Sequence, residues 1–580
     1  MTLISGKDAP LNQSIVKMQD RLKSLGFELE ELEWRNPVPH VWSVHLRDRN
    51  CPTLSTRGKG SSRDAALASA LGEFFERAAT NSFFSDYYLG EQIAHGEFVH
   101  YPNERWFEPA AGRWPDGLLD SVTRDHYDFH DELDPADLID LNSSNWDRGI
   151  CALPFVCQRS AETVWFPVNI ISNLYASNGM AAGNNKWEAR VQALSEIFER
   201  HIKSTIISTG ISLPRIPGYV LRRYPEIIET LDLLKSRGLA VEIRDASLGG
   251  KFPLVNLTLI NPDDGGCRAV FGAHPKFEVA MARAFTSALN GSESDQLVGF
   301  SEPTFNLDEV GTPENLEKHF FESAGKVAWD LLSIETDYPF TEWNIEGDSQ
   351  AEFEALSQRI HRVDMDIYIA DYEHLGLYAC RIIVPGMSEV YPVDKLIKQN
   401  NNLAIEMRAP LLGINELDAE VYPELLDYLD AAGFDESLTV ADLLGLVPDP
   451  DTIWEHLSVG ELRLLLLLAV GRQEEAIDAI QEVLGADSVP AQRALLLRCV
   501  KAVLSITLDP VKELKNYRKL LTSIHGEPLF KRAVAMSRGA EIFEEFKTDS
   551  EQLGTFTRHS ELLAAYQRLQ SLKVDANSQG

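Results

Sequence analysis

The chain has 580 residues, more than one ordinary hydrophobic core accommodates, so about three or four domain-sized units are expected. Its 54 Lys and Arg against 88 Asp and Glu give a formal net charge of −34, which argues against nonspecific nucleic-acid binding. The longest apolar run, residues 464–470, is far shorter than the roughly 20 residues of a bilayer span, and no signal peptide is indicated. The six cysteines have no CxxC or zinc spacing, so we expect free thiols in a cytoplasmic protein.

The N-terminal part is predicted to mix α and β structure. Helical spacing over residues 13–25 ends at Gly26, and residues 40–46 alternate as a strand does. Residues 62–82 carry an apolar helical stripe that is interrupted by glutamates. Residues 95–150 are rich in Pro, Asp, Trp and Gly and have weak periodicity, which indicates an insertion.

A second segment with a strand followed by a helix comes next. A strand over residues 164–171 leads into a glycine-containing loop at 177–184 and then into a long helix at 187–209. Further strand-like runs are at residues 240–244, 254–260, 269–271, 366–369 and 378–384. Because both long helices follow a strand and a loop, we expect a pseudo-duplicated fold with a site shared between its halves.

From about residue 418 the strand patterns disappear, and Leu, Ala, Glu and Arg dominate. Helices are expected at residues 461–470, 474–484, 491–506, 511–523, 529–547 and 557–572. Helical hairpins of this kind stack in tetratricopeptide-like arrays, and a plain helical bundle is the alternative. The expected fold class is therefore α+β over residues 1–417, followed by an all-α, tetratricopeptide-like domain over residues 418–580.

An eight-residue phrase occurs twice, as ALGEFFER at residues 70–77 and ALSEIFER at residues 193–200. Each copy places two glutamates three residues apart on one helical face, beside apolar residues. These glutamates are Glu73, Glu76, Glu196 and Glu199. Carboxylates next to a core need a cation, and the single arginine of each copy, Arg77 or Arg200, cannot neutralise two of them. A bound metal is a natural source of the missing charge.

The second long helix extends this acidic face. Glu188, Gln192, Glu196 and Glu199 follow one another at spacings of four, four and three residues. If the two helices pack near each other, the five glutamates converge. Magnesium prefers oxygen ligands of this kind and also binds phosphate oxygens, so a magnesium–triphosphate site is predicted. Arg77 and Arg200 would contact phosphate or fix the glutamates.

Other interpretations stay open at this stage. The pattern GxxxxGK[ST], the HExxH and GxSxG motifs and a dinucleotide fingerprint are all absent. The glutamates could be ordinary Glu–Arg pairs on amphipathic helices, although the recurrence of the phrase argues against that. A metal-dependent hydrolase without nucleotide is a further alternative.

These residues resemble the YcaO family, ATP-dependent enzymes that activate peptide backbone amides. Of its three signatures, SxxExxER is matched from Glu73 to Arg77 with Ala70 in place of the serine, and ExxxQ is matched by Glu188 and Gln192. The resemblance covers roughly residues 1–410, including the segments 58–60, 177–179 and 381–386. It is greatest for the bacterial member that gives the family its name, which also has a helical C-terminal domain.

The resemblance implies roles for individual residues. Lys7 and Arg200 would contact the ATP phosphates, and Ser14 and Asn184 the nucleotide. Residues expected around the nucleotide are Lys7, Ser14, Arg77, Asn184, Gln192, Arg200 and Arg283. Magnesium ligands or their near neighbours are Glu73, Glu76, Glu188, Glu196 and Glu199. Sequence alone does not say which of the five touch metal.

Two departures from the family pattern stand out. The RxxxE signature should begin at Arg283, but Ser287 occupies the position of its glutamate, and Glu293 is a weak substitute. This puts ATP turnover in doubt more than ATP binding. The chain also ends without the proline-rich segment of azoline-forming members, which argues against heterocycle formation.

As the resemblance implies, we expect a magnesium- and ATP-dependent protein that phosphorylates an amide oxygen and serves as an accessory factor in β-methylthiolation of a small-subunit ribosomal protein. The alternative is an ATP-binding adaptor with little turnover that recruits a radical methylthiotransferase through its helical domain. A homodimer, no direct nucleic-acid contact and no membrane contact are also expected.

Overall fold

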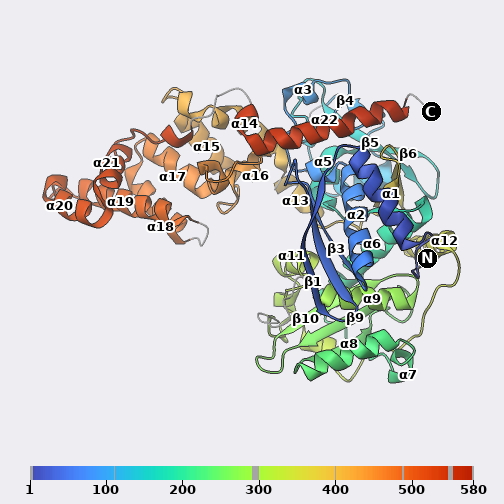
Figure 1. Ribbon diagram of the computed structural model, residues 1–580. Coiled ribbons are helices and arrows are strands. Elements are labelled where there is room, and N and C mark those ends of the chain that lie inside the picture. Colours follow the sequence, from blue (N-terminus) through green and yellow to red (C-terminus); the bar gives the residue numbers. More distant parts are fainter. Residues whose placement is uncertain are drawn as a thin grey trace.

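The computed structural model describes residues 4–109, 112–289, 300–398, 400–485, 489–546 and 553–577. Figure 1 shows an α+β part that contains the sheets and a helical part that projects from one side of it. The described residues include no helix that is both long and apolar enough to cross a membrane. All six cysteines lie in the described part of the chain, are buried and form no disulfide.

The chain begins with an αβββα unit. Its elements are α1 (Leu11–Ser24), β1 (Leu29–Val38), β2 (Val41–Asp48), β3 (Ser55–Gly60) and α2 (Arg63–Ala79). The three strands form an antiparallel sheet in the order β1-β2-β3, and α2 packs against β3 and β2. Gly58 permits this close approach, because a Cβ there would lie 2.0 Å from the Ala66 carbonyl oxygen.

A second αβββα unit follows later in the chain. Its elements are α8 (Pro225–Ser236), β8 (Ala240–Asp245), β9 (Leu254–Ile260), β10 (Cys267–Ala273) and α9 (Phe277–Ala288). Gly272 of β10 approaches Ala280 and Ala284 of α9 at the same offsets at which Gly58 approaches Ala66 and Ala70. The internal repeat in the fold thus joins α2 to α9, whereas the expected duplication paired α2 with the second motif helix.

The third sheet combines strands from before and after the second unit, and it brings the two motif helices together. Its strands are β4 (Arg105–Phe107), β5 (Ile150–Cys157), β6 (Thr163–Pro167), β7 (Met180–Gly183), β11 (Tyr368–Tyr372) and β12 (Tyr378–Ile383). The order is β4-β5-β11-β12-β7, with β6 paired to β5. Both α2 and the second motif helix, α6 (Lys186–Thr209), pack against β7 and β12, so their glutamates face a shared space.

Two local expectations are corrected by the structure. Only residues 164–167 of the expected strand 164–171 are extended, because Pro167 precedes the first turn of α5 (Val168–Tyr175). The expected loop 177–184 contains strand β7, which pairs with β12. The described part of segment 95–150, the expected insertion, contributes β4 and buries Tyr101, Phe107 and Leu138 in the main core.

Smaller helices connect and cover the sheets. They are α3 (Glu91–Ala94), α4 (Ser121–Tyr127), α7 (Gly218–Leu221), α10 (Leu307–Val310), α11 (Pro313–Phe321), α12 (Ser349–His361) and α13 (Val393–Lys398). Among them α12 packs along α6 and places Phe353 against Trp187, with 5.6 Å between the ring centroids. This contact supports the N-terminal end of α6, where the candidate site begins.

The C-terminal part is mainly helical, as expected. Its helices are α14 (Ile405–Leu412), α15 (Tyr422–Ala432), α16 (Val440–Leu444), α17 (Val459–Ala469), α18 (Gln473–Gly485), α19 (Ala491–Thr507), α20 (Leu514–His525), α21 (Glu527–Met536) and α22 (Thr557–Asn577). Helices α17 to α21 pack on one another in sequence around a separate apolar core that begins at Ala404. Helix α22 leaves this array and lies across the α+β part (Figure 1), where Tyr566 is buried in the main core.

Candidate functional site

The first arm of the candidate site is helix α2. The Ser62 side chain accepts a hydrogen bond from the Ala65 backbone and caps the helix, while Ala66, Ala70 and Phe74 are buried in the core. This packing leaves Glu73, Glu76 and Arg77 at the boundary of the core. Arg77 forms an ion pair with Glu73 one turn earlier.

The second arm is helix α6, whose N-terminus holds Glu188. Asn185 caps the helix, and Glu188 in its first turn is only 4% exposed. The Glu188 carboxylate accepts hydrogen bonds from the Lys7 ammonium at 3.1 Å, the Asp8 backbone at 3.0 Å and the Asn184 amide at 2.9 Å. The Ser14 hydroxyl donates to Asn184 Oδ1 at 2.8 Å. The structure therefore brings three of the expected nucleotide contacts together around Glu188, namely Lys7, Ser14 and Asn184.

Four glutamates form one electrostatic cluster between the helices. Burial, together with the charges of Glu196 and Glu73, raises the pKa of Glu76 well above its usual range. Burial also raises the pKa of Glu73 and of Glu196, against the opposing effect of Arg77 and Arg200, and Glu199 adds like charge to Glu196. The side chains of Glu73 and Glu196 nonetheless keep 26% and 24% exposure, so they remain accessible to solvent and to a ligand.

This donor set fits magnesium. It offers carboxylate oxygens and no soft ligand, and its crowded carboxylates are ones that a divalent cation would stabilise in their ionised form. Glu188 lies apart from the four, since eight helical residues correspond to about 12 Å along the axis. Its contacts belong to the Lys7 end of the site, so Glu188 occupies a different part of the acidic face from the other four glutamates.

Arg200 and Arg283 hold the site from two sides. Arg200 pairs with Glu196 at 2.6 Å, donates to Asn178 Oδ1 at 3.2 Å and lies 4.2 Å from the Phe320 ring centroid. Arg283 of α9 donates to Gln192 Oε1 and, at 2.8 Å, to the Ala273 carbonyl oxygen.

The backbone of β10 also enters the site. The Ala273 N–H donates to Glu199 Oε2 at 3.3 Å, and the carbonyl oxygen of the same residue accepts the hydrogen bond from Arg283. His274 beside it is buried, and burial with the charges of Arg283 and Lys7 lowers its pKa well below the usual range. Strand β10 thus links α9 to the acidic face of α6.

One residue that sequence reasoning did not single out joins the site. Lys59, between the two close-packed glycines of β3, donates a 2.7 Å hydrogen bond to Ser287 of α9. The Lys59 side chain is exposed, so its ammonium is accessible to a ligand. Burial lowers the Lys59 pKa, and Glu199, Glu196 and Glu73 oppose this shift. Glu293, the suggested substitute for the missing glutamate, lies outside the described residues.

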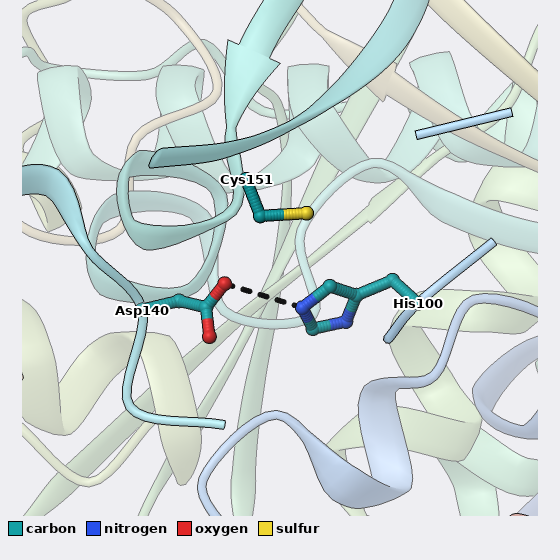
Figure 2. A group of neighbouring side chains, drawn as sticks. All are labelled: His100, Asp140 and Cys151. Carbon is teal, nitrogen blue, oxygen red and sulfur yellow. Dashed lines mark hydrogen bonds and ion pairs between the residues drawn. The ribbon is translucent and has the colours of Figure 1, made fainter. Parts of the chain in front are cut away.

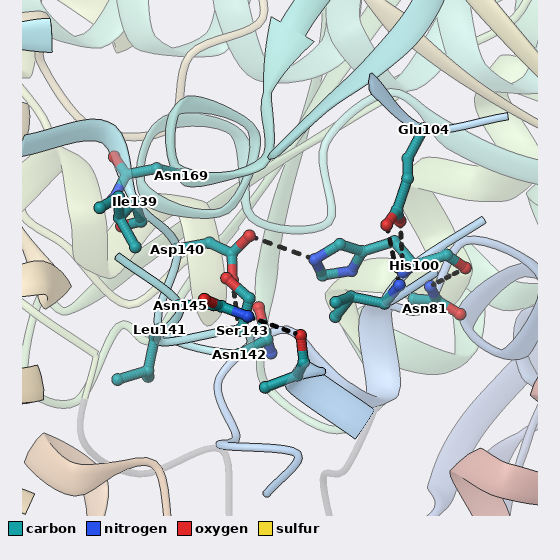
Figure 3. Close-up of polar contacts among 12 residues, drawn as sticks. Asn81, His100, Glu104, Ile139, Asp140, Leu141, Asn142, Ser143, Asn145 and Asn169 are labelled. Atoms are coloured by element: carbon teal, nitrogen blue, oxygen red, sulfur yellow. Dashed lines mark hydrogen bonds and ion pairs between the residues drawn. The ribbon is translucent and has the colours of Figure 1, made fainter. Parts of the chain in front are cut away.

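A second group of potential metal ligands lies elsewhere, in the segment that follows α2. The side chains of His100, Asp140 and Cys151 are buried with their ligand atoms within 4.8 Å of one another, as Figure 2 shows. Asp140 pairs with His100 at 3.3 Å and accepts the Ser143 N–H at 2.5 Å (Figure 3). Burial raises the pKa of Cys151 well above its usual range. The hydrogen-bonded Asp140 and the protonated thiol indicate a structural cluster.

Comparison with known proteins identifies the family. Residues 57–388 match the family model described as YcaO cyclodehydratase, ATP- and Mg²⁺-binding, and residues 404–575 match the YcaO cyclodehydratase C-terminal domain. The chain belongs to the YcaO family. It is therefore an ATP- and Mg²⁺-binding YcaO protein with an α+β domain and a mainly helical C-terminal domain.

Two curated relatives match almost the whole chain. It is 45% identical over 578 residues, 99% of both chains, to the Escherichia coli protein named ribosomal protein S12 methylthiotransferase accessory factor YcaO. It is also 45% identical over 580 residues, 99% of both chains, to an uncharacterized protein of Haemophilus influenzae.

Similar solved structures are more remote. YcaO from Methanopyrus kandleri, bound with AMPPCP and Mg²⁺, is 19% identical with a TM-score of 0.39, covering 66% of this chain and 92% of that one. A heterocyclase in complex with substrate and cofactor is 15% identical with a TM-score of 0.43, covering 68% and 56% of the two chains.

Proposed function

We propose that this YcaO protein uses magnesium and ATP to activate a peptide backbone amide by phosphorylating its oxygen. The observation that carries the proposal is the cluster of Glu73, Glu76, Glu196 and Glu199, which faces a partly open space between α2 and α6. Phosphoryl transfer needs charge neutralisation and positioning more than covalent help, and this site supplies both.

Each side of the site has a proposed task. The four clustered glutamates would hold magnesium, which supplies positive charge to the phosphate oxygens. Lys7 and Arg200 would contact phosphate at opposite ends of the acidic face, with Ser14 and Asn184 beside the nucleotide. Arg283 keeps Gln192 oriented through its hydrogen bond, and Arg77 keeps Glu73 oriented through its ion pair.

The proposed step balances without any further reactant. The amide oxygen attacks the γ-phosphorus, so an O–P bond forms while the bond between the γ-phosphorus and the bridging oxygen breaks. ADP leaves with that electron pair, and the activated amide is ready for a nucleophile. If the amide oxygen attacks the β-phosphorus instead, the bond between that phosphorus and the α–β bridging oxygen breaks, a pyrophosphoryl group is transferred and AMP leaves with the electron pair.

In the cell, we propose that the protein is an accessory factor in β-methylthiolation of a small-subunit ribosomal protein. The support is the 45% identity, across both domains, to the Escherichia coli accessory factor named for ribosomal protein S12. The projecting array α17 to α21 would contact the ribosomal protein or its radical methylthiotransferase. A homodimer is also proposed.

The test is complementation followed by mass spectrometry. A strain that lacks the gene receives the wild-type chain, Glu199→Gln or the exposed control Glu278→Gln, and the modification state of S12 is measured. The proposal expects modified S12 with wild type and with the control, and loss with Glu199→Gln. Unmodified S12 in the wild-type complement would contradict the assigned cellular role.

The hydrogen bond between Lys59 and Ser287 favours a second candidate function. A neutral serine stands where the family pattern has a glutamate, so the site has one carboxylate fewer for metal binding. An ATP-binding adaptor that turns over little nucleotide and recruits a methylthiolating enzyme would tolerate this loss. The adaptor function predicts that phosphate release stays at background, while Mg²⁺-dependent ATP binding and complementation persist.

A further inference from the structure

A second pocket lies where α22 crosses the end of α2. Its walls include Thr80 and Asn81 after α2, Tyr372 of β11, Arg381 of β12 and Tyr566 of α22. It is distinct from the carboxylate cluster, although Thr80 Oγ1 donates to the Glu76 carbonyl oxygen one turn earlier at 2.7 Å. The pocket is therefore shared between the two family domains and adjoins the nucleotide site.

The pocket is lined by a buried cation, Arg381, which is 5% exposed and whose Nε has no hydrogen-bond partner. Its Nη2 donates to the carbonyl oxygens of Ala176 and, at 3.5 Å, Ile171. Within the described residues no ion pair includes this guanidinium. Burial lowers its pKa, and the charge of Glu76 only partly opposes this shift. A buried charge without an ion-pair partner is costly, and a bound anion would reduce that cost.

A buried lysine lies next to residues that line the pocket. Lys573 of α22 is 3% exposed and donates to Asn81 Oδ1 at 2.6 Å and to the His100 carbonyl oxygen at 2.8 Å. Burial lowers the pKa of Lys573 to about 7, and the charge of Glu104 opposes this shift. Lys573 therefore adds positive potential to the pocket only in its protonated form, which an anion in the pocket would favour.

Two buried carboxylates near Lys573 and His100 are already engaged. Asp140 is held by His100 and by the Ser143 N–H, and Glu104 accepts the backbone N–H groups of residues 99–101. Figure 3 shows both carboxylates directed at these partners. A buried guanidinium that forms no ion pair in the described chain and has an unpartnered Nε lines this cavity, and this points to an anionic ligand.

The volume of the cavity limits the size of the ligand, and the lining residues indicate its chemistry. Its volume of about 30 Å³ has room for about two ordered waters or one small oxyanion. Leu153, Phe155 and Ile171 supply apolar surface opposite the polar groups. A planar guanidinium matches the two oxygens of a carboxylate, and the apolar wall suits a short carbon chain. We propose that this pocket binds one small carboxylate, with its oxygens directed at Arg381.

Two sources of that carboxylate are distinguishable: a free short-chain acid, and the acidic side chain of a bound protein. The experiment uses the purified full chain without ATP or Mg²⁺, so its outcome does not depend on the proposed nucleotide chemistry. Thermal unfolding is followed while sodium acetate replaces sodium chloride at constant ionic strength. Acetyl-aspartate N-methylamide and inorganic phosphate are titrated in parallel.

Saturable stabilisation by acetate over chloride is expected. Arg381→Gln should weaken the acetate affinity at least tenfold, and Arg244→Gln, which changes another buried arginine far along the chain, should leave it unchanged. If Arg381→Gln does not fold, Lys573→Met serves instead, with a several-fold loss expected. If acetyl-aspartate N-methylamide stabilises the protein as acetate does, the natural ligand is the acidic side chain of a bound protein. If only acetate stabilises it, the natural ligand is a free short-chain acid.

Three results would overturn the proposal. One is an acetate effect no greater than that of chloride, which would leave the cavity as a water site. Another is unchanged acetate binding in folded Arg381→Gln. The third is saturable binding of phosphate without acetate, which would place a tetrahedral anion where a carboxylate is proposed.

Discussion

The Lys59 ammonium donates a 2.7 Å hydrogen bond to the Ser287 hydroxyl, and this contact joins β3 to α9 at the edge of the carboxylate cluster. Because serine carries no charge, the positive charge of Lys59 is shared among Glu199, Glu196 and Glu73. A lysine thereby supplies part of the cationic charge that the acidic site requires.

The first prediction concerns this contact. Ser287→Glu would pair with Lys59 and return a carboxylate to the site, so half-saturation by Mg²⁺ should occur at a lower concentration. Phosphate release or ATP binding is measured across a Mg²⁺ titration, with Ser287→Ala as the control. Equal Mg²⁺ dependence in all three proteins would show that position 287 does not affect the metal.

Loss of the lysine charge should weaken nucleotide binding. Lys59→Met removes a cation from four crowded carboxylates, and we expect Mg²⁺–ATP affinity to fall roughly tenfold, the scale of one charge-assisted contact. Calorimetry compares it with Lys531→Met, which changes a lysine that is 69% exposed on the helical array. Unchanged affinity in Lys59→Met would remove Lys59 from the site.

The repeated αβββα units depend on glycine at the strand–helix contact. A Cβ on Gly58 would lie 2.0 Å from the Ala66 oxygen and 2.3 Å from the Ala70 nitrogen, so Gly58→Ala must displace backbone. Destabilisation of about 3 kcal/mol or more is expected. Gly72 lies in helix α2, and a Cβ on it would meet no atom within 4 Å. Gly72→Ala should therefore stabilise the protein by about 0.5–1 kcal/mol. Chemical denaturation of both variants measures the contrast.

Lys573 predicts a pH dependence of stability. Burial lowers its pKa from 10.5 to about 7. Because the folded pKa is below the unfolded one, the stabilising contribution is complete above the unfolded pKa and is lost as the pH falls toward 7. As the pH rises between these two values, the free energy of unfolding of wild type should increase by about 1.4 kcal/mol per pH unit relative to that of Lys573→Met. Urea unfolding at several pH values checks this; parallel curves for the two proteins would contradict the buried, neutral lysine.

Part of the site was predictable because its information is local. The repeated phrase sets both helical faces, and α6 begins one residue before the predicted start and ends where predicted, since Asn185 and Gly210 cap it. Free cysteines, the mixed first part and the helical second part also follow from composition and periodicity. The roles of Lys7, Ser14 and Asn184 came from the family resemblance, and the structure places them together around Glu188.

The remainder depends on tertiary contacts that a single sequence does not reveal. Lys59 acquires its position only because α9 packs against β3. Strand β7 has four small or flexible residues with little intrinsic strand preference, and pairing with β12 determines its conformation. Likewise Arg381 lies in an ordinary apolar strand sequence, and only the crossing of α22 encloses the pocket beside it.

The most direct test of the central claim, a magnesium–nucleotide site between α2 and α6, is calorimetric titration of ATP into the purified chain. Wild type and Glu199→Gln are compared with and without Mg²⁺, and Glu278→Gln serves as the exposed control. The account predicts Mg²⁺-dependent binding to wild type and to the control, with loss in Glu199→Gln. Binding that persists in Glu199→Gln, or that ignores Mg²⁺, would contradict it.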